Sequence, residues 1–326
     1  MISPDVASAV RVLGRDGVLT PGQATLLGRV ARGELVSLYP VLQTLLYGAV
    51  LAITGGVALL LKDRVADFGP LTIALLLSLA VLACLGWVAR AAPAFSRGLV
   101  ESPHIAFDYI LLLGALLLAA DLAWCEWRFT PLGANWAWHL CLVSVIYSAL
   151  ALRFDSRVLF VLGLTTFAAW RGVAVLSVEQ ALFAWAGAGP AVRLNGIACG
   201  LLFIAAGQAL VRRDFKAHFE PAATLLGWGI LLLAVAGGTA TGPDASLWLH
   251  RGGLLGLGLL LALRSAAPAR FGLFVMGVLA AYAGFLACTL PWVSSGAPSA
   301  LYIALSAVGL LVLLLRVRAR RARATP

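Results

Sequence analysis

Long hydrophobic stretches recur along almost the whole chain and constrain its fold more than any other feature. Each covers roughly 17 to 21 residues, and a helix needs about 20 apolar residues to cross the hydrocarbon core of a bilayer. A transmembrane β-barrel would instead show short segments of alternating hydrophobicity. The sequence therefore predicts an all-α, polytopic integral membrane protein with about ten transmembrane helices.

The composition excludes a water-soluble fold. Charged residues make up 12% of the chain and hydrophobic ones 62%, whereas soluble domains have about 25% charged residues. Arg171 interrupts the fifth hydrophobic stretch and Arg251 the eighth, so whether these two stretches cross fully stays open. The predicted spans are residues 41–61, 69–89, 106–124, 136–152, 157–176, 194–211, 222–240, 246–263, 271–290 and 299–315.

Positive charge alternates between the short segments that separate the spans. With the N-terminus in the cytoplasm, the outside loops carry Lys62, Arg64, Arg128, Arg171 and Arg193, and Arg251 lies at an outer helix end. The remaining 18 of the 24 Lys and Arg residues then lie inside. This distribution satisfies the positive-inside rule and predicts that both termini are cytoplasmic. The preference for Arg over Lys, with abundant Ala, Leu and Gly, favours a bacterial inner membrane.

The net charge of +10 follows the loops, so we expect no nucleic-acid partner. The chain is predicted to consist of a cytoplasmic helical hairpin (1–40), a transmembrane helical domain (41–315) and a basic cytoplasmic tail (316–326). Anionic lipid headgroups are the expected partners of that tail, because basic segments beside a membrane attract them.

Residues 1–40 read as two short helices separated at Gly17. Thr20 and Pro21 form a cap-and-proline signal, and Gln23 stands at the capping-box position of the second helix. An apolar stripe on this helix must be covered. It either packs within the hairpin or on the membrane domain, or it binds a protein partner or a second copy of the chain.

Two stretches of the sequence resemble a known family. They are Gly14-Arg15-Asp16-Gly17-Val18-Leu19-Thr20-Pro21-Gly22-Gln23, and Arg153-Phe154-Asp155-Ser156-Arg157 followed by Ala168-Ala169-Trp170-Arg171-Gly172-Val173. Over residues 10 to 180 the chain is similar to the bacterial predicted membrane proteins grouped as domain of unknown function 2157. The resemblance implies a polytopic inner-membrane protein with a cytoplasmic N-terminal hairpin, and it implies no activity.

Glycine spacing and one pair of similar segments within the chain predict how the helices pack. Gly196-x-x-x-Gly200 and Gly252-x-x-x-Gly256 are typical of close helix crossings. The segment Ala151-Leu152-Arg153 followed by Phe160-Val161-Leu162-Gly163 is similar to Ala262-Leu263-Arg264 followed by Phe274-Val275-Met276-Gly277. The two segments are four spans apart, so a duplication would give parallel repeats; chance similarity in a Leu- and Ala-rich chain is the alternative.

Most ionisable residues within or beside the spans fall at the predicted outer ends, together with eight of the ten tryptophans. Charged groups in a membrane are costly and usually face a cavity or a partner. One interpretation is that these residues anchor the helix ends at the headgroup interface and that ion pairs such as Asp121–Arg171 neutralise their charges. The sharper hypothesis is a periplasm-facing vestibule that binds an anion. The residues of this outer cluster are Asp121, Glu126, His139, Arg171, His250 and Arg251.

No catalytic, cofactor-binding or metal-ligating motif occurs, so neither an enzyme activity nor a cofactor is predicted. The five cysteines are scattered, and a disulfide among Cys125, Cys141 and Cys288 is left open. A non-catalytic membrane scaffold or envelope-associated component is the first functional hypothesis. A permease for a small, anionic solute is the alternative, and an enzyme acting on a lipid-linked substrate ranks third.

Overall fold

The computed structural model describes residues 12–31, 69–172, 190–239, 244–265, 270–293 and 298–310, and single positions between 45 and 56. It divides into two compact units, residues 50–293 and residues 1–49 together with 294–326. All regular elements in the described ranges are helices, which confirms the all-α prediction for this part of the chain. The predicted boundaries at residues 40 and 315 lie outside the described residues.

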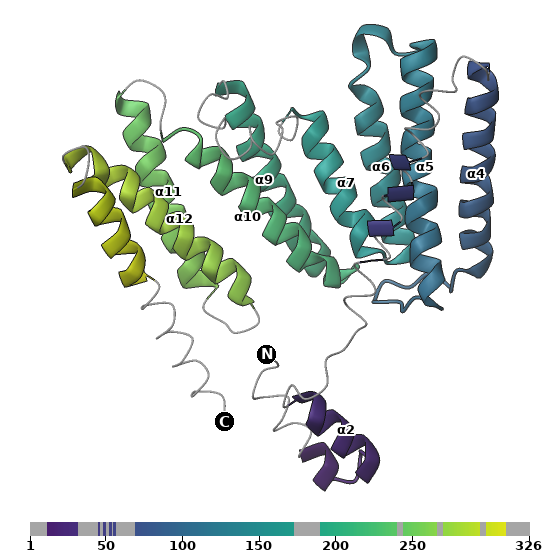
Figure 1. Ribbon diagram of the computed structural model, residues 1–326, viewed down its shortest axis with the longest axis horizontal. Helices are drawn as coiled ribbons and strands as arrows, with labels where there is room; N and C mark the ends of the chain where they lie inside the picture. The colour runs from purple at the N-terminus through teal and green to yellow at the C-terminus, as the bar shows by residue number, and fades with distance from the viewer. Residues whose placement is uncertain are drawn as a thin grey trace. The chain divides into compact units, whose positions relative to one another are not determined.

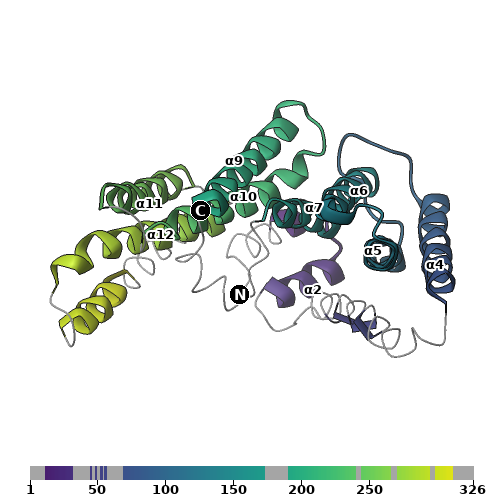
Figure 2. The ribbon, with the colours of Figure 1, turned by 90° about the horizontal axis from the view of Figure 1, so that it is seen from above.

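Within residues 50–293 the helices form four consecutive hairpins. Each helix packs mainly against its neighbour in the sequence, and α7 and α10 also contact the hairpins beside them. Figures 1 and 2 show the four hairpins following one another in a row within this unit. The hairpins are α4 (Pro70–Ala91) with α5 (Ile105–Phe129), α6 (Trp138–Phe154) with α7 (Arg157–Trp170), α9 (Pro190–Arg212) with α10 (Glu220–Ala236), and α11 (Asp244–Arg264) with α12 (Phe271–Thr289). Three 3-10 turns, η1 (Gly133–Asn135), η2 (Ala217–Phe219) and η4 (Leu290–Trp292), lie at their ends.

Six helices in the described residues are long and apolar enough to cross a membrane: α4, α5, α9, α10 with η2, α11, and α12 with η4. This number is consistent with a membrane location. The predicted fourth, fifth and tenth spans are shorter apolar helices, α6, α7 and Pro298–Leu310. Helix α7 ends at Trp170, before Arg171, whereas α11 continues through Arg251. Most of the predicted first span, 41–61, lies outside the described residues.

The tightest corner joins α6 to α7 through two residues. Asp155 ends α6 in the left-handed conformation (φ 60°), and its N–H donates to the Ala151 carbonyl. Ser156 then caps α7, because its side-chain oxygen accepts the N–H of Leu159. This short corner fixes the Asp155 side chain at the point where both helices end.

Glycines allow two of the hairpins to cross at backbone contact. A Cβ on Gly258 of α11 would lie 2.3 Å from the Ala281 nitrogen of α12, and one on Gly200 of α9 would lie 2.7 Å from the Gly227 oxygen of α10. The predicted crossing at Gly200 is therefore confirmed. Among the described residues the prediction for Gly252 and Gly256 is not met, because a Cβ at either position has no described atom within 4 Å. Both glycines lie off the face of α11 that packs on α12.

The two similar segments of the sequence each end on a glycine, and each of these glycines lies where the two helices of a hairpin are in close contact. Gly163 lies in the second helix of its hairpin, and a Cβ there would be 2.6 Å from Ser148 Oγ of the first helix. Gly277 is placed in the same way, 2.6 Å from the Ala262 nitrogen. The two similar segments thus occupy corresponding places in the second and fourth hairpins.

In the smaller unit, the described residues 12–31 contain a last helical turn, a turn at Gly17 (φ 70°) and α2 (Pro21–Ala31). The predicted capping box is confirmed. Thr20 N–H donates to Gln23 Oε1 at 3.0 Å, and Gln23 N–H donates to Thr20 Oγ1 at 3.4 Å. The rest of the predicted hairpin, residues 1–11 and 32–40, lies outside the described residues.

Candidate functional site

The larger unit has two chemically different ends. We call the end with the connections α4–α5, α6–α7, α9–α10 and α11–α12 the basic end. The opposite end, with the connections α5–α6 and α10–α11, is called the tryptophan end, because Trp127, Trp136, Trp138, Trp248 and Trp292 are exposed there. The six residues of the predicted outer cluster all lie toward the tryptophan end.

Two carboxylates of α5 belong to that cluster, and each has its own local partner. Asp121 Oδ2 accepts a hydrogen bond from Ser78 Oγ of α4 at 2.7 Å. Its second oxygen, Oδ1, is buried, and no group in the described part of the chain forms a hydrogen bond with it. Glu126 is buried, and its Oε2 accepts the N–H of Leu132 at 3.2 Å. Glu126 therefore closes the turn after α5.

The predicted Asp121–Arg171 ion pair does not form. Arg171 Nη2 instead donates to Asn195 Oδ1 of α9 at 2.9 Å, and Asn195 Nδ2 donates back to the Arg171 carbonyl at 3.1 Å. The guanidinium also lies over the Trp170 ring, 5.5 Å from its centroid. The reciprocal amide contact holds the end of α7 against α9 and leaves Asp121 on a different helix pair.

The remaining three residues of the outer cluster also contact nearby backbone groups. His139 Nδ1 is within hydrogen-bond distance of the Trp136 carbonyl, and His250 Nδ1 lies 2.7 Å from the Ser246 carbonyl. Arg251 Nε donates to the Thr239 carbonyl at 3.2 Å, with its guanidinium over the Trp248 ring. Among the described residues, no ion pair joins two members of this cluster. The cluster is thus a set of separate local contacts.

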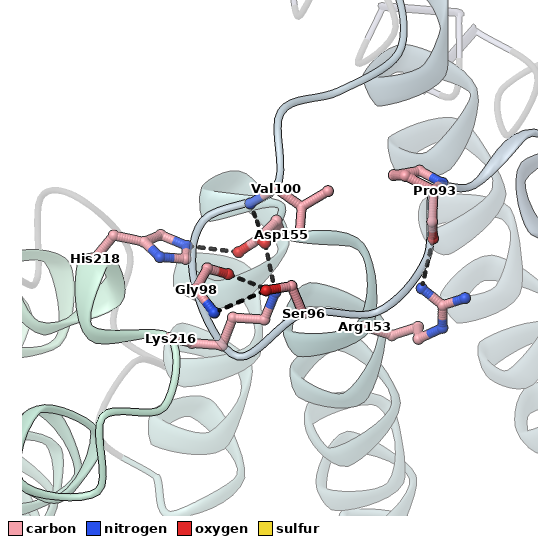
Figure 3. A network of polar contacts seen from close by, with 8 residues as sticks. All are labelled: Pro93, Ser96, Gly98, Val100, Arg153, Asp155, Lys216 and His218. Atoms are coloured by element: carbon pink, nitrogen blue, oxygen red, sulfur yellow. Dashed lines mark hydrogen bonds and ion pairs between the residues drawn. The ribbon is translucent and has the colours of Figure 1, made fainter.

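A buried charge cluster, which the sequence did not reveal, lies at the basic end. Asp155, Lys216 and His218 form it, and we call these three residues the corner cluster (Figure 3). Lys216 Nζ pairs with Asp155 Oδ2, and the side chains of Lys216 and Asp155 are only 1% and 2% exposed. Because Asp155 stands between α6 and α7 and Lys216 between α9 and α10, this ion pair joins two hairpins.

The loop between α4 and α5 completes the corner cluster from a third hairpin. Lys216 Nζ donates to the Gly98 carbonyl at 3.2 Å, and the Lys216 N–H donates to the Arg97 carbonyl at 2.7 Å. The Val100 N–H donates to Asp155 Oδ2 at 2.8 Å. These contacts join residues that are 55 to 119 positions apart in the sequence, and they hold the loop over both corners (Figure 3).

The imidazole of His218 approaches the other oxygen of the same carboxylate. His218 Nε2 lies 2.6 Å from Asp155 Oδ1, and neither atom has a further partner in the described ranges. The two oxygens of Asp155 therefore face one lysine and one histidine from the same short segment.

Glu220 extends the contacts to the fourth hairpin. Its Oε1 accepts a hydrogen bond from Thr224 Oγ1 at 3.0 Å and lies 3.5 Å from Arg270 Nη2, just before α12. Lys216, His218 and Glu220 all belong to one five-residue segment. Residues 216–220 thus contact the corners of all three other hairpins.

Sequence reasoning missed the corner cluster because its members lie in charge-rich loops that read as determinants of topology. One signal was present. Lys216 is one of only two lysines among 24 basic residues, and this rarity distinguishes it from the arginines of the other loops. A lysine ammonium is a compact charge with three donors on a flexible stem, whereas the guanidinium is a planar, rigid fork.

Among the described residues, no group of three His, Cys, Asp or Glu side chains is placed to hold a metal ion. All five cysteines are free thiols, so the disulfide left open among Cys125, Cys141 and Cys288 is not formed. Comparisons of this chain with protein-family models, with curated proteins and with solved structures give no match.

Proposed function

We propose that this protein is a non-catalytic scaffold or envelope-associated component of the bacterial inner membrane, with both termini in the cytoplasm. The contacts of residues 216–220 carry the proposal. The buried charges of this segment are used to join helix hairpins, and Lys216 and Asp155 have almost no exposed surface that a substrate could reach. Because the pair joins the α6–α7 corner to the α9–α10 connection, it supports a role in holding the hairpins together.

The orientation and the family assignment belong to the same proposal. Most of the Lys and Arg residues described in the larger unit lie in or beside the loops of the basic end. This distribution supports placing that end in the cytoplasm. The local resemblance to domain of unknown function 2157 supports a cytoplasmic N-terminal hairpin. Anionic lipid headgroups beside the basic tail complete this arrangement.

We assign the scaffold's contact surface to residues 1–40, acting by self-association. On α2, Leu26 is 58% exposed and Leu27 is 38% exposed. Both belong to the apolar stripe predicted from the sequence, which a second copy of the hairpin would cover. A different protein partner is the alternative occupant, and the following experiment separates the two.

A bacterial two-hybrid assay tests self-association and orientation together. Reporter fragments fused to the N-terminus of the full chain give a signal only when both fragments are cytoplasmic and two copies associate. We expect a signal for the native chain, a loss of signal for Leu26→Glu because the charge interrupts the apolar stripe, and no loss for Thr25→Glu on the opposite face of α2.

A dimerising coiled coil inserted before residue 1 provides the control. It should restore the signal of Leu26→Glu if the N-terminus is cytoplasmic. If the native chain gives no signal and the coiled coil restores one, self-association is refuted and a different partner remains. Silence of both would refute the cytoplasmic N-terminus.

One observation favours the second candidate, a permease for a small anionic solute. Arg171 is bound by a neutral amide, and no described carboxylate forms an ion pair with it. Its positive charge is therefore available to an anion at the tryptophan end. Guanidinium groups bind carboxylates and phosphates through paired hydrogen bonds.

A thermal-shift screen of the purified protein against small carboxylates and phosphates tests this candidate. A ligand at 100 times its Kd stabilises the native state by about 2.7 kcal/mol. If the chain is a permease, we expect a hit that Arg171→Gln abolishes and that Arg128→Gln, at the same end, retains. Hits that are equal in both variants would exclude Arg171 as the anion site.

A further inference from the structure

The loop between α4 and α5, residues 92–104, lies at the level of the lipid headgroups. Trp87, near the end of α4, is 38% exposed. Its ring packs against that of His104, the N-cap residue of α5, with the centroids 5.4 Å apart. Tryptophan prefers the headgroup level of a bilayer. The chain therefore leaves α4 and enters α5 at this level.

Two apolar side chains of this loop are exposed. Phe95 is 50% exposed and Leu99 is 61% exposed. One side of the Phe95 ring faces the protein, where Lys216 Nζ lies 5.1 Å from its centroid and Phe215 is the neighbouring ring. Apolar side chains at the boundary between headgroups and acyl chains gain free energy by burial in the lipid. The exposed surfaces of Phe95 and Leu99 suit that boundary.

The exposed charges in and beside the loop are mainly positive. Glu101 is exposed, whereas Asp108 accepts a hydrogen bond from Ser102 Oγ and Asp155 is buried in the corner cluster. Guanidinium groups bind phosphate through paired hydrogen bonds. This surplus of positive charge is complementary to an anionic headgroup. The exposed arginines are Arg90, Arg97, Arg153 and Arg157.

Contacts with the protein order the loop before any lipid binds. The corner cluster holds its middle, through the carbonyls of Arg97 and Gly98 and the N–H of Val100. Arg153 holds its start, because Nη1 donates to the Pro93 carbonyl at 3.5 Å. A shallow pocket lined in part by Pro93 and Arg153 opens beside the loop. An ordered site binds a ligand at a lower entropic cost than a flexible one.

We propose that the α4–α5 loop is a binding site for anionic phospholipids. Arg97 and Arg153 bind the phosphate groups, and Phe95 and Leu99 contact the upper part of the acyl chains. An acidic protein segment has the same charge, but the level of Trp87 places the loop beside lipid. The site rests on the membrane location of the chain alone. Neither residues 1–40 nor the basic tail take part, so it can fail while the scaffold proposal holds.

Photo-crosslinking of the full chain tests the site. p-Benzoylphenylalanine in place of Phe95 keeps an aromatic ring beside Phe215 and captures the molecule that contacts the loop. In vesicles of equal amounts of phosphatidylglycerol and phosphatidylcholine, we expect lipid adducts that are mainly phosphatidylglycerol, identified by mass spectrometry. Irradiation in intact membranes should give the same kind of adduct. Adducts with protein in place of lipid, or no adduct at all, would overturn the proposal.

Arg97→Gln in the crosslinking chain tests the role of charge. The Arg97 side chain is exposed and only its carbonyl contacts Lys216, so the loop should keep its structure. One arginine beside an anionic surface raises the preference for anionic lipid about fivefold. We therefore expect the ratio of phosphatidylglycerol to phosphatidylcholine adducts to fall by that factor.

Arg264→Gln is the matched control. It removes one exposed arginine from the same end of the larger unit, at the fourth hairpin, and should leave the adduct ratio at residue 95 unchanged. Equal falls in the two variants would show that the preference comes from the charge of the whole end and would refute a site at the loop. A native ratio equal to that of the vesicles would refute it as well.

Discussion

Replacing Lys216 with methionine is expected to destabilise the protein strongly. The change leaves the Asp155 carboxylate buried without its ammonium partner and removes the donor to the Gly98 carbonyl. Breaking a buried ion pair by removing one partner costs about 3–5 kcal/mol. The measurement is the free energy of unfolding in detergent, followed by tryptophan fluorescence.

Arg213→Met is the matched control, because it removes the same charge from the same connection. Arg213 is exposed, so the expected change is within about 0.5 kcal/mol. Combining Lys216→Met with Asp155→Asn should recover part of the loss, since the buried charge is then absent. Equal stabilities of the Lys216 and Arg213 variants would show that the buried pair does not hold the corners.

Replacing Gly258 with alanine is expected to cost about 1–3 kcal/mol, the usual range for overpacking a well-packed interior. The added methyl group would meet the backbone of α12 at Ala281, where no flexible side chain can move aside. The two helices must therefore separate. Unfolding of the purified variant in detergent measures the effect.

Gly256→Ala gives the comparison two residues away on the same helix. A Cβ there has no atom of the described residues within 4 Å, and alanine favours a helix over glycine by up to about 1 kcal/mol. We therefore expect this variant to equal or exceed the native stability. A similar loss in both variants would mean that α11 and α12 do not cross at Gly258.

The sequence predicted the helices well because hydrophobic length is a local property. Each stretch predicted between residues 69 and 290 contains a helix, although the bounds differ by several residues. Arg171 ends α7, whereas Arg251 does not interrupt α11. Arg171 donates to Asn195 of α9 and Arg251 donates to the Thr239 carbonyl, so both arginines have partners that lie outside their own helices.

The contacts between helices were harder to predict, because they join residues that are far apart in the sequence. The glycine spacing in α11 pointed to Gly252 and Gly256, but only the position of α12 decides which glycine is approached, and that is Gly258. The corner cluster joins residues that are 61 and 118 positions apart. No spacing rule within one helix could bring Asp155 and Lys216 together.

The position of Lys216 in the chain has a consequence for biogenesis. Asp155 is synthesised 61 residues before its lysine partner, which at about 5–20 residues per second corresponds to roughly 3–12 s of translation. Until Lys216 is synthesised, the Asp155 carboxylate between α6 and α7 has no ammonium partner. Arrival of the third hairpin supplies Lys216 and His218, and the fourth then adds Arg270 to Glu220. Assembly in the order of synthesis thus adds contacts between the hairpin corners at each step.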